Sequence, residues 1–321
     1  MTKPPRSKPA LHANHPDMVW VDGGRFQMGS DRHYPEEAPR RPIQVDGFWI
    51  DPTPVTNRQF SAFVEATGWV TLAERPADPK DYPGADPSML IPASSVFTPT
   101  QGPVDLSNHL NWWTYTPGAS WRNPLGPDSG LEGLEDHPVV HVALEDVEAY
   151  ARWAGLDLPT EAEWEYAALG GREDAEYAWG DELEPDGKHH ANVWQGRFPY
   201  ENTAADGWVR TSPVKAYAPN GFGLYDMIGN VWEWTRDWWS VAATPPAKSC
   251  CAPVNPRGGA KSGSGDRLAP RLPRRVMKGG SHLCAPSYCR RYRPAARHPQ
   301  AVDTSTSHIG FRCVKRAAAT G

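Results

Sequence analysis

Apolar residues recur at helical spacing in two segments of the chain. Positions three and four residues apart share one face of an α-helix, so this pattern indicates a helix with one buried side. The apolar positions are Phe60, Phe63 and Val64 in the first segment, and Val147, Tyr150, Ala151 and Ala154 in the second. The sequence therefore predicts amphipathic helices over 57–67 and 144–154.

Start and stop signals fix the ends of these helices and indicate a third. A threonine followed three residues later by Gln or Glu makes a capping box, because each side chain bonds the backbone N–H of the other residue. Thr56 with Gln59 opens the first helix, and Thr160 with Glu163 opens a third over 161–169. Glycines end all three segments, which supports the assignment: Gly68, Gly155, and Gly170 with Gly171.

Short apolar runs predict strands, and they are scattered along the chain. We expect extended segments at 18–29, 43–50, 138–142, 212–218, 275–281 and 309–315. These runs do not alternate with the helices, and no glycine-rich phosphate loop is present, so a doubly wound nucleotide-binding fold is improbable. The pattern predicts an α+β fold with a low content of regular secondary structure.

The composition is that of a folded chain with many turns. Of 321 residues, 29 are Gly, 34 are Pro and 15 are Trp. Gly and Pro favour turns, and Trp fills a core while keeping a polar N–H. We expect a disordered tail over 1–17, one domain over 18–316 and a short tail over 317–321, with an irregular loop over 255–274.

Charge and hydropathy exclude several classes of protein. The net charge is -5, so nucleic acid is a poor candidate partner. No apolar run approaches the roughly 20 residues of a membrane-spanning helix, and the basic start lacks the apolar segment of a secretory signal. We therefore expect a cytoplasmic protein without a membrane partner, in which an odd number of cysteines, five, favours free thiols or metal ligands over a disulfide framework.

Two of these cysteines, Cys284 and Cys289, form a C-x₄-C pair. An extended chain would place them about 16 Å apart on opposite faces, and a helix would separate them by about 140°. Only a bend brings both sulfurs together, and Pro286 between them favours one. Converging thiolates suit Cu(I), zinc or a redox disulfide. From these residues alone, two unrelated buried cysteines remain the simpler interpretation.

Other candidate groups are weaker. Four cations beside the pair would lower the thiol pKa if they point inward: His282, Arg290, Arg291 and Arg293. We expect Cys313 to be a core thiol and Cys250 with Cys251 to be loop or packing thiols. The pair His137 and His141 is expected to be structural, and the acidic residues of the third helix, Glu161, Glu163 and Glu165, to stabilise its N-terminus. Two irregular stretches carry oxygen donors of the kind calcium binds.

Taken together, several motifs resemble one family. They are VDGGRFQMGS, VTNRQFSAFVEATG, HPVVHV, LPTEAEWEYAA, ANVWQGRFP, PNGFGLYDMIGNVWEWTRDWW, KGGSHLC, YCRRYRPAAR and GFRC. The sequence is similar to formylglycine-generating enzymes, also called sulfatase-modifying factors, from about residue 18 to about residue 315. The resemblance implies their C-type-lectin-like fold and a monomer. It also implies oxidation by dioxygen of the cysteine in a C-x-P-x-R motif of an unfolded sulfatase to Cα-formylglycine.

The resemblance also assigns residues. It implies Cu(I) held by Cys284 and Cys289, an oxygen pocket lined by Ser281 and Trp232, and Tyr288 beside the pair. It implies two structural calcium sites, one formed by Asn192, the Val193 carbonyl, Asp206 and the Trp208 carbonyl, the other by Asp226, the Gly229 and Val231 carbonyls and Glu233.

The sequence departs from the family pattern at three places. Pro294 replaces a cysteine of the secreted animal members, Cys313 has no evident partner, and His308 stands where many members have asparagine. The first two support the cytoplasmic assignment, and the third leaves the substrate contact there open. Two alternatives remain: a non-catalytic paralogue that binds the sulfatase motif, and a metal-free thiol-disulfide oxidoreductase.

Overall fold

The computed structural model describes residues 16–241, 252–267 and 269–317. It contains three α-helices in these ranges, α1 (Asn57–Thr67), α2 (Leu144–Ala154) and α3 (Glu161–Leu169). All three helix predictions are confirmed, and both predicted capping boxes form. Each helix ends at a glycine in the left-handed conformation, as the sequence predicts.

Eleven short strands form four small sheets in the described residues. The first sheet has the order β1-β4-β11 and the second the order β10-β7-β8-β9, and β2 pairs with β3 and β5 with β6. The strands are β1 (Val19–Val21), β2 (Gly24–Met28), β3 (Arg41–Val45), β4 (Phe48–Ile50), β5 (Ala93–Phe97), β6 (Trp113–Pro117), β7 (Trp232–Trp238), β8 (Arg274–Lys278), β9 (His298–Ala301), β10 (Ile309–Gly310) and β11 (Val314–Arg316). The expected α+β class with little regular structure is confirmed. Single turns of 3₁₀-helix lie at Pro35–Glu37, Leu72–Glu74, Pro87–Met89, His109–Asn111, Pro185–Gly187 and Lys261–Gly263.

Two of the strand predictions are wrong. The segment 138–142 forms only a single bridge, between Pro138 and Thr56, and His141 has a φ of 59° that breaks an extended chain. The segment 212–218 turns at Lys215, whose φ is 67°. The other four predicted segments contain strands, while β5, β6, β7 and β9 formed where no strand was expected.

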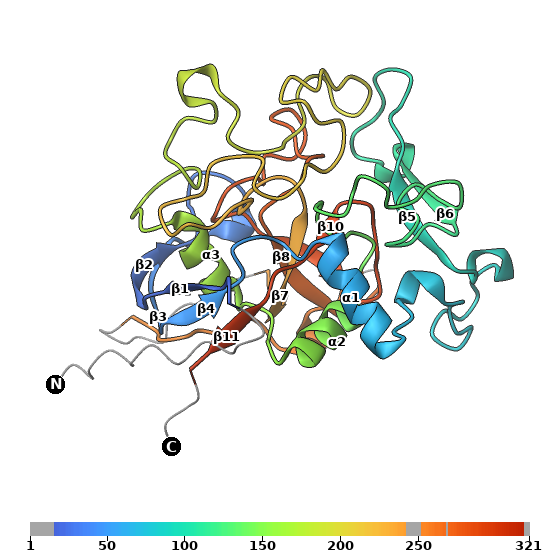
Figure 1. Cartoon of the computed structure of the whole chain (residues 1–321), viewed down its shortest axis with the longest axis horizontal. Helices are drawn as coiled ribbons and strands as arrows, with labels where there is room; N and C mark the ends of the chain where they lie inside the picture. The colour runs from blue at the N-terminus through green and yellow to red at the C-terminus, as the bar shows by residue number, and fades with distance from the viewer. Residues whose placement is uncertain (1–15, 242–251, 268, 318–321) are drawn as a thin grey trace.

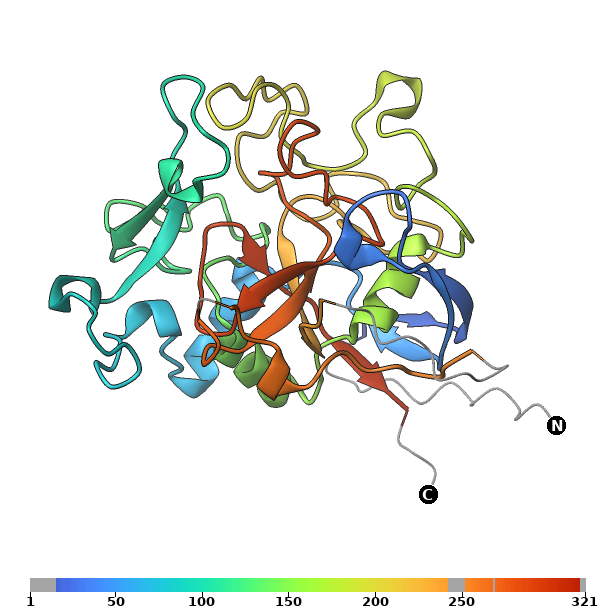
Figure 2. The same cartoon turned by 180° about the vertical axis from the view of Figure 1, so that it is seen from behind.

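Aromatic side chains join α1 to α2 and to the segment that follows β10. The fully buried ring of Phe60 on α1 contacts Trp121, Tyr150 and Phe311, with ring centroids 5.1 to 6.4 Å apart. α1 and α2 lie side by side, and the β5–β6 hairpin projects at the opposite end of the molecule from β2 and β3 (Figures 1 and 2). The core thus binds together segments that are far apart in the sequence.

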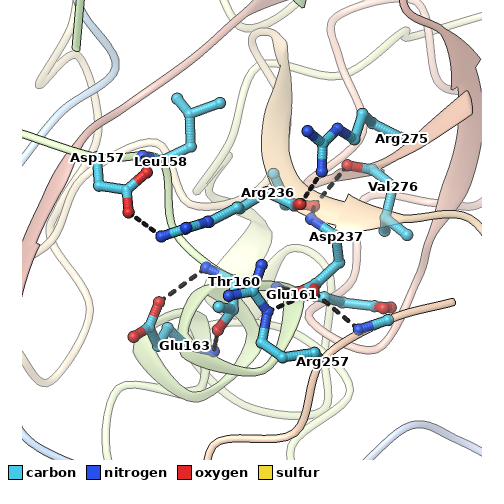
Figure 3. A network of polar contacts seen from close by, with 12 residues as sticks. Asp157, Leu158, Thr160, Glu161, Glu163, Arg236, Asp237, Arg257, Arg275 and Val276 are labelled. Carbon is cyan, nitrogen blue, oxygen red and sulfur yellow. Dashed lines mark hydrogen bonds and ion pairs between the residues drawn. The ribbon is translucent and has the colours of Figure 1, made fainter. Parts of the chain in front are cut away.

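The glutamates of α3 do more than stabilise its N-terminus. Glu163 forms the capping box, and the backbone N–H of Glu161 donates to Asp237 (Figure 3). In addition, each glutamate pairs with a cation from the C-terminal third of the chain: Glu161 with Arg297, Glu163 with Arg316, and Glu165 with Lys278. The expectation that these glutamates act only at the helix end was therefore incomplete.

The predicted tails, 1–17 and 317–321, lie almost entirely outside the described residues. Within the described ranges, no helix is both long and apolar enough to cross a bilayer. The predicted loop over 255–274 contains one turn of 3₁₀-helix, at Lys261–Gly263, before β8 begins.

Candidate functional site

Two tight turns after β8 bring Cys284 and Cys289 together. The backbone N–H of Cys284 donates to the Ser281 carbonyl at 2.9 Å, and that of Cys289 donates to the Ala285 carbonyl at 3.0 Å. As a result the two sulfur atoms lie 3.1 Å apart, and both cysteines are free thiols. The predicted bend is confirmed, and the interpretation as two unrelated cysteines is wrong.

Gly280 makes this close folding possible. Its φ is +71°, and a Cβ atom there would lie 2.9 Å from the backbone nitrogen and Cα of Tyr292. A side chain would therefore push the chain after Cys289 away from the chain before Ser281. The glycine lets the two ends of the cysteine segment pack directly on each other.

The two thiols differ in their environment. The Cys284 thiol is buried and donates to the Cys289 sulfur. This hydrogen bond lowers the pKa of Cys289, with a further contribution from the Arg291 guanidinium, whose Nη1 lies 4.0 Å from the sulfur. Burial, followed by the same pairing, raises the pKa of Cys284. The geometry therefore favours a thiolate on Cys289 and a thiol on Cys284.

Of the four cations expected near the pair, Arg291 points toward it. Its Nη2 pairs with Glu36 at 2.7 Å, and its guanidinium lies over the Tyr34 ring. Arg290 pairs with Glu176, and Arg293 forms a buried pair with Glu37.

His282 hydrogen-bonds to a backbone carbonyl. Its Nδ1 lies 2.8 Å from the Asn230 carbonyl. Burial lowers its pKa to about 4, so the ring is neutral at pH 7 and adds no positive charge beside the thiols.

The cysteine pair lies in a cleft of about 600 Å³. Ser281, Trp232 and Tyr288, which the sequence assigned to the site, line the same cleft as both cysteines. Tyr288 stacks on Phe198 with centroids 4.4 Å apart and contacts the edge of Trp112. The predicted residues thus converge in space.

Several residues of the cleft were not anticipated. Besides the residues already named, its walls include Ser95, His109, Leu110, Trp113, Tyr115, Met277, Leu283, Pro299, Gln300, Thr304 and Thr306. Five of them come from β5, β6 and β9, three strands that the hydrophobic pattern did not predict. The aromatic run Trp112, Trp113 and Tyr115 was the one signal in the sequence that could have indicated a binding wall.

Two histidines also face the cleft. His308 lies 2.5 Å from the Thr306 hydroxyl through Nδ1, and its ring centroid is 4.8 Å from that of Trp113. His298 packs against Trp232. Burial lowers the pKa of both imidazoles, so both are neutral at pH 7. His308 therefore contacts the aromatic wall at the position where the sequence departs from the family pattern.

The first set of expected calcium ligands includes an unsatisfied oxygen. Asn192 is 1% exposed, and its Nδ2 donates to the Arg210 carbonyl, while its Oδ1 is buried without a hydrogen-bond partner. Asp206 accepts hydrogen bonds from the Tyr217 hydroxyl and the Trp208 N–H. An unpaired buried oxygen is costly, and a bound cation would satisfy it. These residues fit calcium.

In the second set of expected calcium ligands, the carboxylates already have ion-pair or hydrogen-bond partners. Glu233 pairs with Arg312 and accepts from the Trp164 N–H, and Asp226 accepts from the Lys215 N–H. Burial raises the pKa of Asp226. In the described residues, no group of three or more His, Cys, Asp and Glu side chains is arranged to hold a metal. A cation at either set would therefore need the backbone carbonyls that the resemblance implies.

The remaining candidates lie apart from the cleft. Cys313 is fully buried in the core, as expected, and Cys250 and Cys251 lie outside the described residues. His141 is held between the Ser94 hydroxyl and the Pro124 carbonyl, and His137 lies 3.0 Å from the Thr211 hydroxyl. These contacts agree with a structural role for both histidines.

Comparisons with known proteins match nearly the whole chain. Residues 3–317 match the family model of the sulfatase-modifying factor enzyme 1-like domain. A formylglycine-generating enzyme from Mycobacterium tuberculosis is 56% identical, over 93% of this chain and 97% of the relative. Another, from Thermomonospora curvata, is 46% identical over 92% of each. The solved structure of PvdO from Pseudomonas aeruginosa is similar in fold, with a TM-score of 0.62 at 23% identity, covering 97% of this chain and all of that one.

Proposed function

The chain belongs to the sulfatase-modifying factor family, and from this premise we propose that it converts the cysteine of a C-x-P-x-R motif in an unfolded sulfatase to Cα-formylglycine. The proposal includes dioxygen as the oxidant and Cu(I) as the metal. The observation that carries it is the convergence of the Cys284 and Cys289 thiols in an open cleft. A structural thiol pair would not need access to a cleft of this size.

The donor set fits copper. Two soft sulfur ligands suit Cu(I), and hard oxygen ligands do not. Cu(I) bound by Cys284 and Cys289 would supply the one-electron chemistry that lets dioxygen react with a thiol. Cys289 is poised to bind as a thiolate because Arg291 and the Cys284 S–H stabilise its negative charge.

The walls of the cleft position the substrate. Trp112 and Tyr288 form an apolar surface beside the thiols, which excludes water from the reacting sulfur. Ser281 and Trp232 border the same space, where dioxygen would reach the cysteine pair. An extended peptide can enter because the cleft opens to the surface.

The reaction needs a reductant as well as dioxygen. Conversion of CH₂SH to CHO with release of H₂S removes two electrons from the substrate, whereas reduction of dioxygen to water takes four. We propose that two molecules of an external thiol supply the other two electrons and leave as a disulfide. The balance is RCH₂SH + O₂ + 2 R′SH → RCHO + H₂S + H₂O + R′SSR′.

Structural calcium completes the proposal. The unsatisfied Asn192 Oδ1 supports a cation at the first set of oxygen donors, with Asp206 as its carboxylate. Asp226 and Glu233 would serve the second. Calcium would tie together irregular chain that has little secondary structure of its own.

The test uses a C-x-P-x-R peptide and the purified protein with a thiol reductant. With copper and air, the peptide should lose about 18 Da at its cysteine. Leaving out copper or dioxygen should prevent the loss. An unchanged peptide that still binds would favour a non-catalytic binding protein, and a mixed disulfide alone would favour a thiol-disulfide oxidoreductase; either result would overturn the proposal.

A further inference from the structure

The edge of one strand forms part of the wall of the cleft. β9 is the outermost strand of its sheet, and β8 is its neighbour. Three consecutive residues of β9 line the cleft, His298, Pro299 and Gln300. Neighbouring side chains in a strand point to opposite faces of the sheet, so three in a row border one cleft when the edge of the strand faces it.

The register shows which backbone groups point to this edge. Pro299 lies opposite Val276 and has no N–H to exchange with it. Because hydrogen-bonded and non-hydrogen-bonded pairs alternate in an antiparallel ladder, the backbone groups of Pro299 and Ala301 point away from β8. The Ala301 carbonyl accepts from the Thr304 N–H. The Pro299 carbonyl and the Ala301 N–H are left at the edge.

These two groups have the arrangement that a parallel strand needs. In a parallel ladder, one residue donates its N–H to a carbonyl on the neighbouring strand and accepts from the N–H two residues further along. Pro299 and Ala301 flank Gln300 in this way. Among the described residues, no strand other than β8 and no isolated bridge pairs with 298–301.

We propose that the sulfatase polypeptide adds to the edge of β9 as a parallel fifth strand, with one of its residues bound through both backbone groups opposite Gln300. This inference rests on the proposed function, since it places the substrate of that reaction. We identify the sulfatase polypeptide as the added strand because the edge of β9 borders the same cleft as Cys284 and Cys289. An unfolded chain brings unpaired backbone groups of its own, which folded proteins do not.

Backbone pairing at this edge also explains how the bound peptide can vary in its side chains. Hydrogen bonds to the main chain hold a peptide whatever its side chains are, and pockets then select particular residues. At the same time Pro299 removes one donor from the edge, which limits pairing with unrelated strands. The Pro299 carbonyl and the Ala301 N–H therefore suffice to bind the backbone of one peptide residue.

The test measures binding of a C-x-P-x-R peptide whose cysteine is replaced by serine, to the metal-free, full-length protein. Each backbone N–H of the peptide in turn is replaced by N-methyl, and in a second series its amide is replaced by an ester. The ester removes the N–H without adding bulk. We expect one position to lose about 5-fold or more in affinity in both series, since one hydrogen bond is lost. The positions directly before and after it should change by less than about 2-fold, because their N–H groups point away from β9.

A variant of the protein tests the second hydrogen bond, which the Ala301 N–H donates. Ala301→Pro removes the N–H donor and should weaken binding of the unmodified peptide about 5-fold, whereas the matched variant Ala301→Ser keeps the N–H and the affinity. Thermal unfolding checks that Ala301→Pro still folds, and the peptide series needs no variant. If the serine peptide binds and the cysteine peptide is oxidised by the copper-loaded protein, but no position stands out, the strand pairing is wrong while the proposed function stands. If the serine peptide does not bind and the cysteine peptide does not react, both fail.

Discussion

The buried pair between Lys278 and Glu165 should hold the cysteine segment in place. Lys278 is the last residue of β8, three residues before Ser281, and its Nζ lies 2.8 Å from Glu165 Oε2 with both side chains buried. Glu165 Oε1 also accepts from the Gly29 N–H. Replacing Lys278 by Met leaves a buried carboxylate without its cation, which costs about 3–5 kcal/mol of unfolding free energy. Glu165→Gln, which leaves the ammonium unpaired, should cost a similar amount.

The double variant separates this electrostatic effect from packing. With both charges removed, Met and Gln fill similar volumes and Gln can still accept from Gly29, so the combined loss should be about 1–3 kcal/mol. Urea unfolding of the four proteins gives the coupling energy, which we expect to be at least about 3 kcal/mol. The exposed pair Arg58 and Asp136 is the control, with an expected coupling below about 1 kcal/mol. Additive losses at Lys278 and Glu165 would refute the reasoning.

Three further predictions address charge and metal. Arg291→Met should slow alkylation of Cys289 several-fold at pH 7 in the metal-free protein, because the cation that favours its thiolate is lost; Arg290→Met should not, and equal rates in all three proteins would contradict this role. Burial raises the pKa of Asp51 to about 7, so the contribution of this group to stability should be greatest below about pH 4, should fall as pH rises from about 4 to about 7, by up to about 4 kcal/mol, and should level off above pH 7. Asp51→Asn should flatten that fall in urea titrations between pH 4 and 7, and an unchanged slope would show that Asp51 is not its source. Calcium should raise the Tm of the wild type by more than that of Asn192→Ala, which loses a ligand of the first site and keeps the second, and a Tm that changes with neither calcium nor chelator would contradict the calcium proposal.

The helices were predictable because their signals are local. The capping box of α1 joins Thr56 and Gln59, three residues apart, and its apolar face is visible within one segment. The strands were harder, since their partners are distant. β7 reads as a mixed run of Trp and charged residues, and it becomes a strand through pairing with β8 about forty residues later and β10 beyond. Local pattern carries no information about such partners.

The same distinction between local and distant signals applies to the site. The backbone restrictions of Pro286 favoured a bend between Cys284 and Cys289, but the residues alone left two unrelated cysteines as the simpler interpretation, and the family resemblance was needed to imply that their sulfurs meet. The walls of the cleft could not be predicted, because Ser95, Trp113 and Gln300 reach it from three separate segments. The glutamates of α3 were assigned a local role for a related reason: Lys278 lies 113 positions from Glu165, so no helical spacing could indicate the pair.

The most direct test of the account is the mass of the C-x-P-x-R peptide after incubation with copper, air, a thiol reductant and each of four proteins. The wild type and Cys313→Ala, which removes a buried thiol outside the cleft, should both convert the peptide with the loss of about 18 Da. Cys284→Ser and Cys289→Ser should leave it unchanged while keeping the far-UV circular dichroism of the wild type. Conversion at the wild-type rate by either of these two variants would contradict the claim that the two sulfurs form the reacting centre.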